Sequence, residues 1–380
     1  MRNTLILLLI LLVNILFVIW YTQYSSTADL QTADELREKY SRPVSEWPEP
    51  FVEDSIDWEP LGPLPDSPYR GVDSLQALTD LGRVLFFDPR LSASNQISCS
   101  SCHDPNLGWS DGKVNSVGHD HFTGKRNSIS LLNVWMKEPL FWDGRAETLT
   151  DQLHHPITDP IEMNQDVGQL SEKLQNIEGY GDLFHEAFED TVITMPRIAE
   201  ALTQFQRTIQ SRKSDFDRFV LGDKDALSDR QLEGLHLFRT KAQCMNCHNG
   251  PLFSDFEFHN LGLHYYGRER EDLGRFWVTG NDEDVGKFRT PQLRDVMFTA
   301  PWFHNGLFGS IEGVINMYNA GMARPEPRPG MKTDDPPYPT TSPLLQELNL
   351  TDEEMQAIIA FLESISETPY RMPRPELPGR

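Results

Sequence analysis

Cysteine is scarce in this chain: only four cysteines occur in 380 residues, and none lies outside two short motifs. No thiol is therefore left over for a disulfide framework. Basic residues are also few, with 34 Lys and Arg against 57 Asp and Glu, and the net charge of −23 argues against binding to the phosphates of nucleic acid. No stretch alternates convincingly between apolar and polar residues, so we do not expect a large sheet.

The four cysteines belong to two Cys-X-X-Cys-His motifs, which consist of Cys99, Cys102 and His103, and of Cys244, Cys247 and His248. Two thiols at this spacing can each add to a vinyl group on one edge of a haem, and the histidine that follows becomes an iron ligand. A thioredoxin-like redox pair or one zinc site with four thiolates are the alternatives. The histidine in both motifs and the long globular stretch between them favour two covalently bound c-type haems.

Long apolar runs are absent except at the N-terminus, where residues 1–22 predict a signal anchor or a signal peptide. The run of about 17 apolar residues is at the short limit for crossing a bilayer and is interrupted by Asn14. It passes into Trp20 and Tyr21 without an Ala-X-Ala step, which favours a retained anchor over a cleaved peptide. Either way, we expect the rest of the chain to lie in the periplasm and to contain no further membrane segment.

The rest of the sequence predicts a mainly α fold, with two cytochrome c-like haem domains that have long loops and follow the N-terminal apolar helix. The expected divisions are a flexible Pro-rich tether at 23–70, haem domains at 71–215 and 216–368, and a tail at 369–380. Apolar periodicity predicts helices at 73–87, 167–178, 182–190 and 196–211. Capping boxes predict two more helices, one after Ser228 with Gln231 and one at 352–365 after Thr351 with Glu354. We expect long loops at residues 108–163 and a Pro-rich insertion at residues 323–343.

Several segments around the haem motifs have a distinctive sequence: 141–145 with Gln152, Pro156 and Glu162-Met163, then 288–294, 299–306 and, before the first haem motif, 85–88. These segments resemble those of bacterial di-haem cytochrome c peroxidases and the related enzyme MauG. They occur in the family's order and spacing, so the resemblance spans roughly residues 73–366.

The resemblance implies a division of labour between the haems. His103 would be the proximal ligand of the haem that cleaves peroxide, and His248 that of a haem that stores or relays electrons. Trp142 would lie between the haems and carry oxidising equivalents across the gap. Glu162 would be the distal acid/base residue, with Gln152 as a polar group of the same pocket.

The resemblance also suggests distal iron ligands. His119 occupies the place of a histidine that closes the first haem in many resting peroxidases, although His121 could compete with it and a solvated loop histidine is the alternative. At the second haem the corresponding position is Tyr318, as in MauG, where common peroxidases have Met. Met317 is adjacent, but neighbouring helical positions point about 100° apart, so only one of them can face the iron. A phenolate stabilises ferric iron, whereas a thioether favours ferrous iron.

Two further features come from the resemblance. A calcium ion is expected at the junction of the domains, bound by the side chain of Asn127 and the main-chain carbonyls of Thr299 and Pro301. MauG has a surface tryptophan six residues before its second haem histidine, where this chain has Ala242. Modification of methylamine dehydrogenase by the same route is therefore not expected.

Three functions follow in order of preference. The first is a periplasmic peroxidase that reduces hydrogen peroxide to water with electrons from a quinol or a small redox protein, either a c-type cytochrome or a cupredoxin. The second is a MauG-like enzyme that oxidises residues of a partner protein through a bis-ferryl state. The third is a di-haem electron carrier without catalysis. The acidic surface would attract a basic redox protein, and a homodimer is expected from the behaviour of many relatives.

Overall fold

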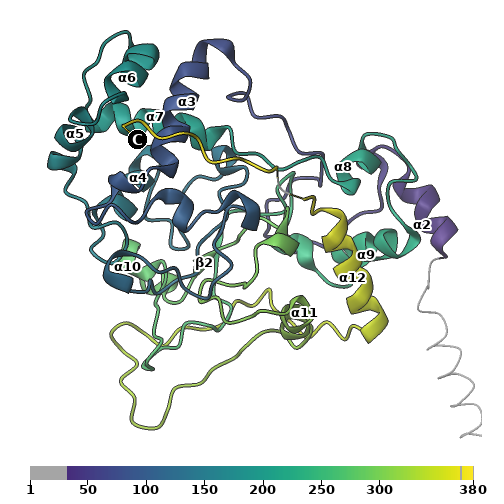
Figure 1. Cartoon of the computed structure of the whole chain (residues 1–380). Coiled ribbons are helices and arrows are strands. Elements are labelled where there is room, and N and C mark those ends of the chain that lie inside the picture. Colours follow the sequence, from purple (N-terminus) through teal and green to yellow (C-terminus); the bar gives the residue numbers. More distant parts are fainter. Residues whose placement is uncertain (1–31, 369, 380) are drawn as a thin grey trace, which may run out of the picture.

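The computed structural model describes residues 32–368 and 370–379, so the apolar segment predicted at 1–22 lies outside the described residues. The described chain is mainly helical, as expected (Figure 1). The helices are α2 (Ala33–Tyr40), α3 (Gln76–Phe87), α4 (Leu149–Thr158), α5 (Val167–Gln175), α6 (Tyr180–Phe188), α7 (Met195–Arg207), α8 (Asp215–Val220), α9 (Asp229–Arg239), α10 (Phe276–Thr279), α11 (Ile311–Asn319) and α12 (Asp352–Ser364). Strands β1 (Phe258–His259) and β2 (Phe288–Arg289) form a small antiparallel pair. Among the described residues, no helix has the length and apolar character needed to cross a bilayer.

Each half of the molecule is built around one closely packed helix pair, α3 with α7 and α9 with α12. In the first half, a Cβ atom on Gly82 would lie 1.9 Å from the carbonyl oxygen of Ala201. In the second half, a Cβ atom on Gly234 would lie 2.0 Å from the carbonyl oxygen of Ala357. Any side chain would push these helices apart, so glycine is required at both crossings. The same contact at matching points shows that the halves share one plan.

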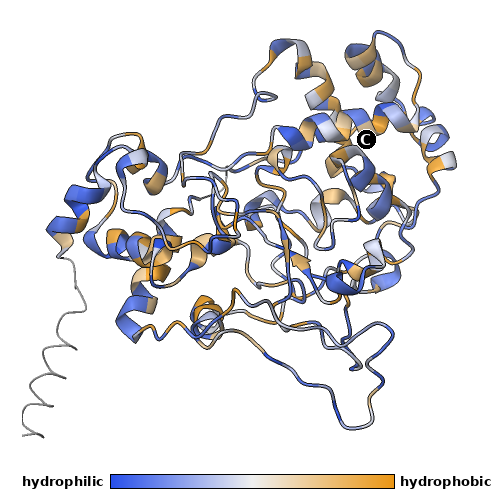
Figure 2. Cartoon of the chain, turned by 180° about the vertical axis from the view of Figure 1, so that it is seen from behind, coloured by the Kyte–Doolittle hydropathy of each residue, from blue (hydrophilic) through white to orange (hydrophobic). Residues whose placement is uncertain are grey.

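The paired helices bury their apolar faces in separate cores. Phe86 and Phe205 pack in the first core, and Phe238 and Phe361 pack in the second. Figure 2 shows the resulting division of the helices into hydrophilic and hydrophobic sides. The two capping boxes predicted from the sequence are present at the starts of α9 and α12, where each N-cap hydroxyl and the third helical side chain satisfy backbone N–H groups.

The segment expected to be a flexible tether, residues 23–70, requires a correction in its described part. Residues 32–64 pack on the second half, where α2 contacts α9, and residues 65–70 contact the first half near Arg207 and Gln210. Leu36, Tyr40 and Trp47 are buried in the second core, and the Phe51 N–H donates to the Arg239 carbonyl at 2.7 Å. The few apolar side chains of this Pro-rich stretch are thus spaced to pack into the second core. Local composition alone does not predict this packing.

The C-terminal tail, expected at 369–380, crosses back over the first half (Figure 1). Its Met372 and Leu377 pack against the first core. The Arg90 guanidinium donates to the Pro378 carbonyl at 2.9 Å. Each terminal segment therefore packs on the half that is distant from it in sequence, so the two halves are braced in both directions.

The expected loop region, residues 108–163, requires a second correction because it contains helix α4. Thr148 and Asp151 form a capping box at its start, and Pro156 lies inside the helix. A proline in a helix interior usually breaks it, which conceals α4 in the sequence. Residues 323–343 form the long loop at the lower edge of Figure 1, as expected of an insertion.

Candidate functional site

The two Cys-X-X-Cys-His motifs hold their histidines in the same way. The His103 Nδ1 lies 3.1 Å from the Trp109 carbonyl oxygen, and the His248 Nδ1 lies 2.9 Å from the Phe253 carbonyl oxygen. Because a carbonyl only accepts, Nδ1 carries the proton in each ring, and Nε2 is left with a free lone pair. Burial lowers the pKa of both imidazoles, which keeps them neutral. Both rings are therefore prepared to bind a metal through Nε2.

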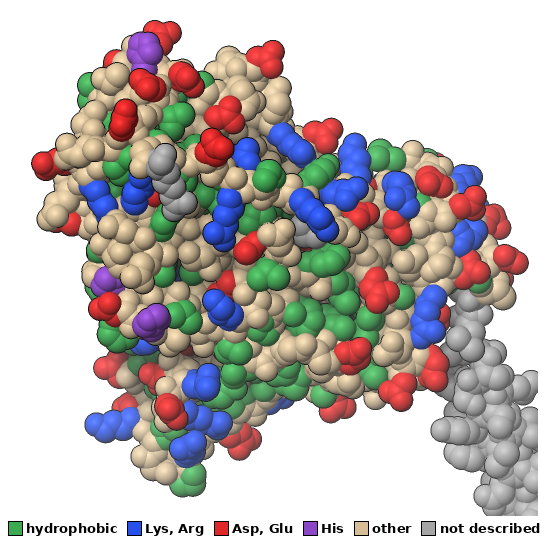
Figure 3. Space-filling model, viewed as in Figure 1, with side chains coloured by type: hydrophobic (Ala, Val, Ile, Leu, Met, Phe, Trp, Pro, Cys, Tyr) green, Lys and Arg blue, Asp and Glu red, His purple; other side chains and the backbone are tan. Residues whose placement is uncertain are grey.

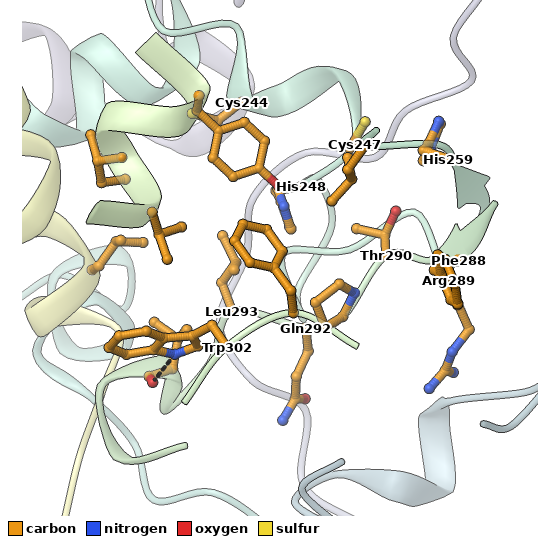
Figure 4. A pocket seen from close by; sticks show the side chains of 18 of the residues that line it. Cys244, Cys247, His248, His259, Phe288, Arg289, Thr290, Gln292, Leu293 and Trp302 are labelled. Carbon is orange, nitrogen blue, oxygen red and sulfur yellow. Dashed lines mark hydrogen bonds between the residues drawn. The ribbon is translucent and has the colours of Figure 1, made fainter. Parts of the chain in front are cut away.

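Each motif lines its own cavity. The first cavity contains Cys99, Cys102 and His103 in its wall, and the second contains Cys244, Cys247 and His248. Figure 4 shows the second motif on one side of its cavity, with Trp302 on the other side. Two thiols and one imidazole with a free Nε2 at the wall of a mostly apolar cavity are the groups that attach a c-type haem. The residues of both cavities thus fit a covalently bound haem.

Trp142, the residue predicted to lie between the haems, belongs to the walls of both cavities. It is 9% exposed, and its indole N–H donates to the Asn127 carbonyl at 2.9 Å. Its own carbonyl accepts from the Arg289 N–H at 2.8 Å. The ring meets His304 edge to face at a centroid distance of 6.4 Å. These contacts fix the indole between the two haem cavities.

Gln152 and Glu162 line the first cavity together with His103. Gln152 comes from α4, and Glu162 follows in the turn after this helix, where its N–H donates to the Asp159 carbonyl at 3.1 Å. Burial raises the pKa of Glu162, the Asp159 charge adds to this rise, and Arg145 opposes it. The carboxyl group is therefore a better proton acceptor than an exposed glutamate.

His119 is placed differently from the other predicted residues of the first cavity. Its neighbour Gly118 belongs to the cavity wall, but His119 does not. The His119 Nε2 lies 3.4 Å from a carboxylate oxygen of Asp120, and its Nδ1 is buried without a hydrogen-bond partner among the described residues. His121, the competing histidine, is exposed. The loop thus holds both histidines outside the cavity in this conformation.

At the second cavity the structure distinguishes two adjacent candidates on α11. Tyr318 belongs to the cavity wall with His248, whereas Met317 does not. Burial raises the pKa of Tyr318 above its usual value, with smaller contributions from the thiols of Cys247 and Cys244. Its phenol is therefore neutral unless a cation lies beside it.

The three residues expected to bind calcium, Asn127, Thr299 and Pro301, all belong to the wall of the second cavity. The Asn127 amide donates from Nδ2 to the Lys113 carbonyl at 2.8 Å, which leaves Oδ1 available. Within the described parts of the chain, no hydrogen bond is donated to the carbonyl oxygens of Thr299 or Pro301. These three oxygens fit the preference of calcium for neutral oxygen donors.

Sequence reasoning missed two charged residues, Lys137 and Arg289, which line both cavities. Arg289 lies within the segment 288–294 that carries the resemblance, and Lys137 interrupts an apolar stretch four residues before Phe141. The sequence feature that could have identified Lys137 is the presence of a lysine within a mostly apolar stretch. The role of this pair depends on contacts across the two halves, which the sequence does not display.

Comparisons with known proteins agree with this geometry. Residues 76–225 match the family of di-haem cytochrome c peroxidases. The cytochrome-c peroxidase IdrP1 of Pseudomonas sp. strain SCT is 36% identical over 352 residues, which cover 84% of this chain and 89% of that protein. The methylamine utilization protein MauG of Methylorubrum extorquens is 36% identical over 301 residues, 78% of this chain and 80% of that protein.

Solved structures share the fold. A MauG-like protein associated with microbial copper homeostasis has a TM-score of 0.69 at 28% identity, over 84% of this chain and 93% of that chain. The diheme peroxidase BthA of Burkholderia thailandensis has a TM-score of 0.64 at 24% identity, over 86% of this chain and 98% of that chain. Two c-type haems are the cofactors of this family, and both attachment sites are present here. These relatives, together with the two haem attachment sites, show that the chain belongs to the di-haem cytochrome c peroxidase family.

Proposed function

We propose that this protein is a peroxidase that reduces hydrogen peroxide to water in the first cavity, with electrons that enter at the second. The observation that carries the proposal is Trp142, whose indole is fixed between the cavities and lines both. A carrier without catalysis has no need of two unlike cavities, of which the first contains Glu162 and Gln152 and the second does not.

Side chains of the first cavity transfer the protons that the reaction requires. When bound, the haem held by His103 supplies an iron that accepts peroxide and changes oxidation state. Glu162 takes a proton from one peroxide oxygen on its carboxylate and returns it to the other oxygen, which leaves as water. Two electrons and two further protons complete the reduction to two water molecules. Gln152 is placed on the same wall to orient the peroxide.

Electrons are supplied by a small redox protein, a c-type cytochrome or a cupredoxin, or by a quinol. The net charge of −23 favours a basic partner, and Figure 3 shows acidic side chains over both halves of the face seen in Figure 1. We place the protein in the periplasm, where such haems are attached, with residues 1–22 as its membrane anchor and a homodimer as its assembly. These points rest on the sequence and the resemblance.

Tyr318 is proposed as the distal ligand of the second haem. Its position in the cavity wall supports it over Met317, and a bound iron would supply the cation that lets the buried phenol ionise. The proposed calcium ion is bound by Asn127, Thr299 and Pro301 at the junction of the halves. His119 is proposed to enter the first cavity only after its loop rearranges.

A second function, oxidation of residues in a partner protein as by MauG, is favoured by Tyr318. A phenolate ligand stabilises the oxidised iron and makes the second haem a poor acceptor for ordinary cytochromes. The surface tryptophan used by MauG is replaced by Ala242, which is buried at 5% exposure beside the second cavity. Any partner protein would therefore be oxidised through a different surface.

Steady-state turnover of hydrogen peroxide with a reduced cytochrome or cupredoxin tests the leading proposal. We expect turnover by the calcium-loaded protein and a loss of about tenfold or more in the Trp142→Phe variant, because the smaller ring leaves a gap and loses the bond to Asn127. The reaction of peroxide with the first haem alone, followed in one turnover, should be nearly unchanged.

These measurements distinguish the peroxidase from an enzyme that oxidises a partner protein. No turnover by the loaded, pre-reduced protein would contradict the peroxidase. Unchanged turnover in Trp142→Phe would contradict the path through the indole. A stable doubly oxidised state formed from the resting ferric protein, with poor turnover, would favour oxidation of a partner protein.

A further inference from the structure

Lys137 and Arg289 place two basic side chains in the interior of the molecule, in the shared wall of the two cavities. Lys137 is 2% exposed and Arg289 is 4% exposed. They come from different halves and are in contact, since the Arg289 guanidinium donates to the Lys137 carbonyl oxygen at 3.4 Å. A pair of like charges buried this deeply is costly unless an anion accompanies it.

No protein carboxylate forms an ion pair with them: among the described residues, neither Lys137 nor Arg289 has a carboxylate oxygen within 4.0 Å. Burial and the neighbouring Arg289 lower the pKa of Lys137 well below its usual value, and the charge of the buried Asp295 opposes this only in part. The Lys137 ammonium donates to the Ser130 carbonyl at 3.2 Å, and Arg289 donates to the Pro139 carbonyl at 2.8 Å. The Nε of Arg289 is buried with no partner in the described chain. Burial lowers the pKa of Arg289 only to about 10, so its charge persists at neutral pH. The site therefore holds a buried positive charge on Arg289 and a lysine whose charged form would be stabilised by an anion from outside the polypeptide.

The covalent attachment of the haems identifies that anion. A haem carries its two vinyl groups on one edge and its two propionate carboxylates on the opposite edge. The cysteines fix the vinyl edge, so the propionates point toward the end of the cavity away from the thiols. Figure 4 shows the Arg289 guanidinium at the end of the second cavity away from Cys244 and Cys247.

We propose that Lys137 and Arg289 form one carboxylate-binding site shared by both haems, which receives a propionate from each cavity. An Arg guanidinium suits a carboxylate because its N–H groups can donate in parallel, and Lys adds a second positive charge. One site that touches both cofactors also couples them. With the haems bound, a positive charge held in the wall of both cavities would disfavour the oxidised form of each iron and so raise both reduction potentials.

The Lys137→Met variant removes the charge while it keeps a side chain of similar length. Lys173→Met is the matched control, because the Lys173 ammonium also donates to a backbone carbonyl, that of Ser92 at 2.7 Å, but lines neither cavity. Spectroelectrochemical titration gives the midpoint potentials of the two haems in each protein. We expect both potentials to fall in Lys137→Met, neither to move in Lys173→Met, and both to return in Lys137→Arg. A Lys137→Met protein with two haems and both potentials unchanged would overturn the proposal, as would a shift confined to one haem.

The wild-type protein provides a test that does not depend on the variant folding. If the propionates neutralise the site, the potentials stay constant when chloride is exchanged for a weakly binding anion. Potentials that follow the chloride concentration would assign the site to a free anion and overturn the proposal. Because potentials are measured without peroxide or a donor, a failure here is distinct from a failure of the proposed peroxidase activity.

Discussion

Replacement of Glu162 by Gln is the most direct test of proton transfer in the first cavity. The two side chains have nearly the same shape, but the amide cannot take a proton from peroxide. Glu162 lines the cavity with Gln152, and burial together with the Asp159 charge raises the pKa of its carboxyl group. A positioned acid–base group contributes about 10²–10⁴-fold to rate. Since Gln152 and the iron remain to bind peroxide, we expect a loss of about 10³-fold, or about 4 kcal/mol of transition-state stabilisation.

The assay is the second-order rate of peroxide reaction with the reduced protein, followed in a stopped-flow spectrometer. Glu147→Gln is the matched control, because this exposed glutamate makes the same chemical change outside the cavity and should react as the wild type does. Both variants should retain two haems and the same absorption spectrum. A Glu162→Gln rate within about threefold of the wild type would refute acid–base catalysis by this residue and favour a di-haem electron carrier.

Three further predictions concern the second haem and the stability of the fold. Tyr318→Phe should remove the low-spin ferric signal of the second haem in electron paramagnetic resonance, whereas Met317→Leu should leave it intact. Gly234→Ala would place a Cβ 2.0 Å from a backbone oxygen of α12 and should lower the free energy of unfolding by about 3 kcal/mol, whereas Gly313→Ala, whose Cβ meets no atom closer than 3.8 Å, should not lower it. Asp88 is buried, which raises its pKa, but hydrogen bonds from neighbouring side chains more than offset this and lower the pKa below 3.8. Its stabilising contribution is thus complete above about pH 4 and is lost as pH falls through the lowered pKa, so the stability deficit of Asp88→Asn, measured by denaturant unfolding, should shrink in acid.

The parts of the structure that depend on local chemistry could be predicted from the sequence. The spacing of thiols and histidine fixed the haem attachment sites, because that reaction involves only five consecutive residues. The capping boxes at Ser228 and Thr351 predicted two helix starts, because the N-cap residue and the third helical residue that cap each other's backbone lie within one turn.

The parts that depend on contacts distant in sequence could not be predicted. Residues 32–70 appeared to be a tether because their apolar residues are sparse, yet the Glu59 N–H finds the side chain of Asn249 at 3.2 Å across the molecule. The contact between Lys137 and Arg289 could not be predicted for the same reason, since the two residues come together only when both halves are folded. Local composition describes neither the partner surface nor the space between cavities.

The repeated architecture explains how one scaffold provides two different haem environments. Residues 126–158 align with residues 288–320 without an insertion, and the halves exchange equivalent hydrogen bonds: the Arg289 N–H donates to the Trp142 carbonyl, and the Asn127 N–H donates to the His304 carbonyl. Trp142 and His304 therefore occupy matching positions and meet between the cavities.

The same alignment places α4 on α11, and both helices begin after a hydroxyl N-cap, Thr148 or Ser310. At the position where α11 presents Tyr318 to the second cavity, α4 presents Pro156 to the first. A proline side chain has no atom that can bind iron, so the first half offers no ligand at the position where the phenol of Tyr318 would be available to the second haem. The proline that obscured α4 in the sequence would thus account for the proposed difference between an open first haem and a closed second haem, since the surrounding backbone is shared.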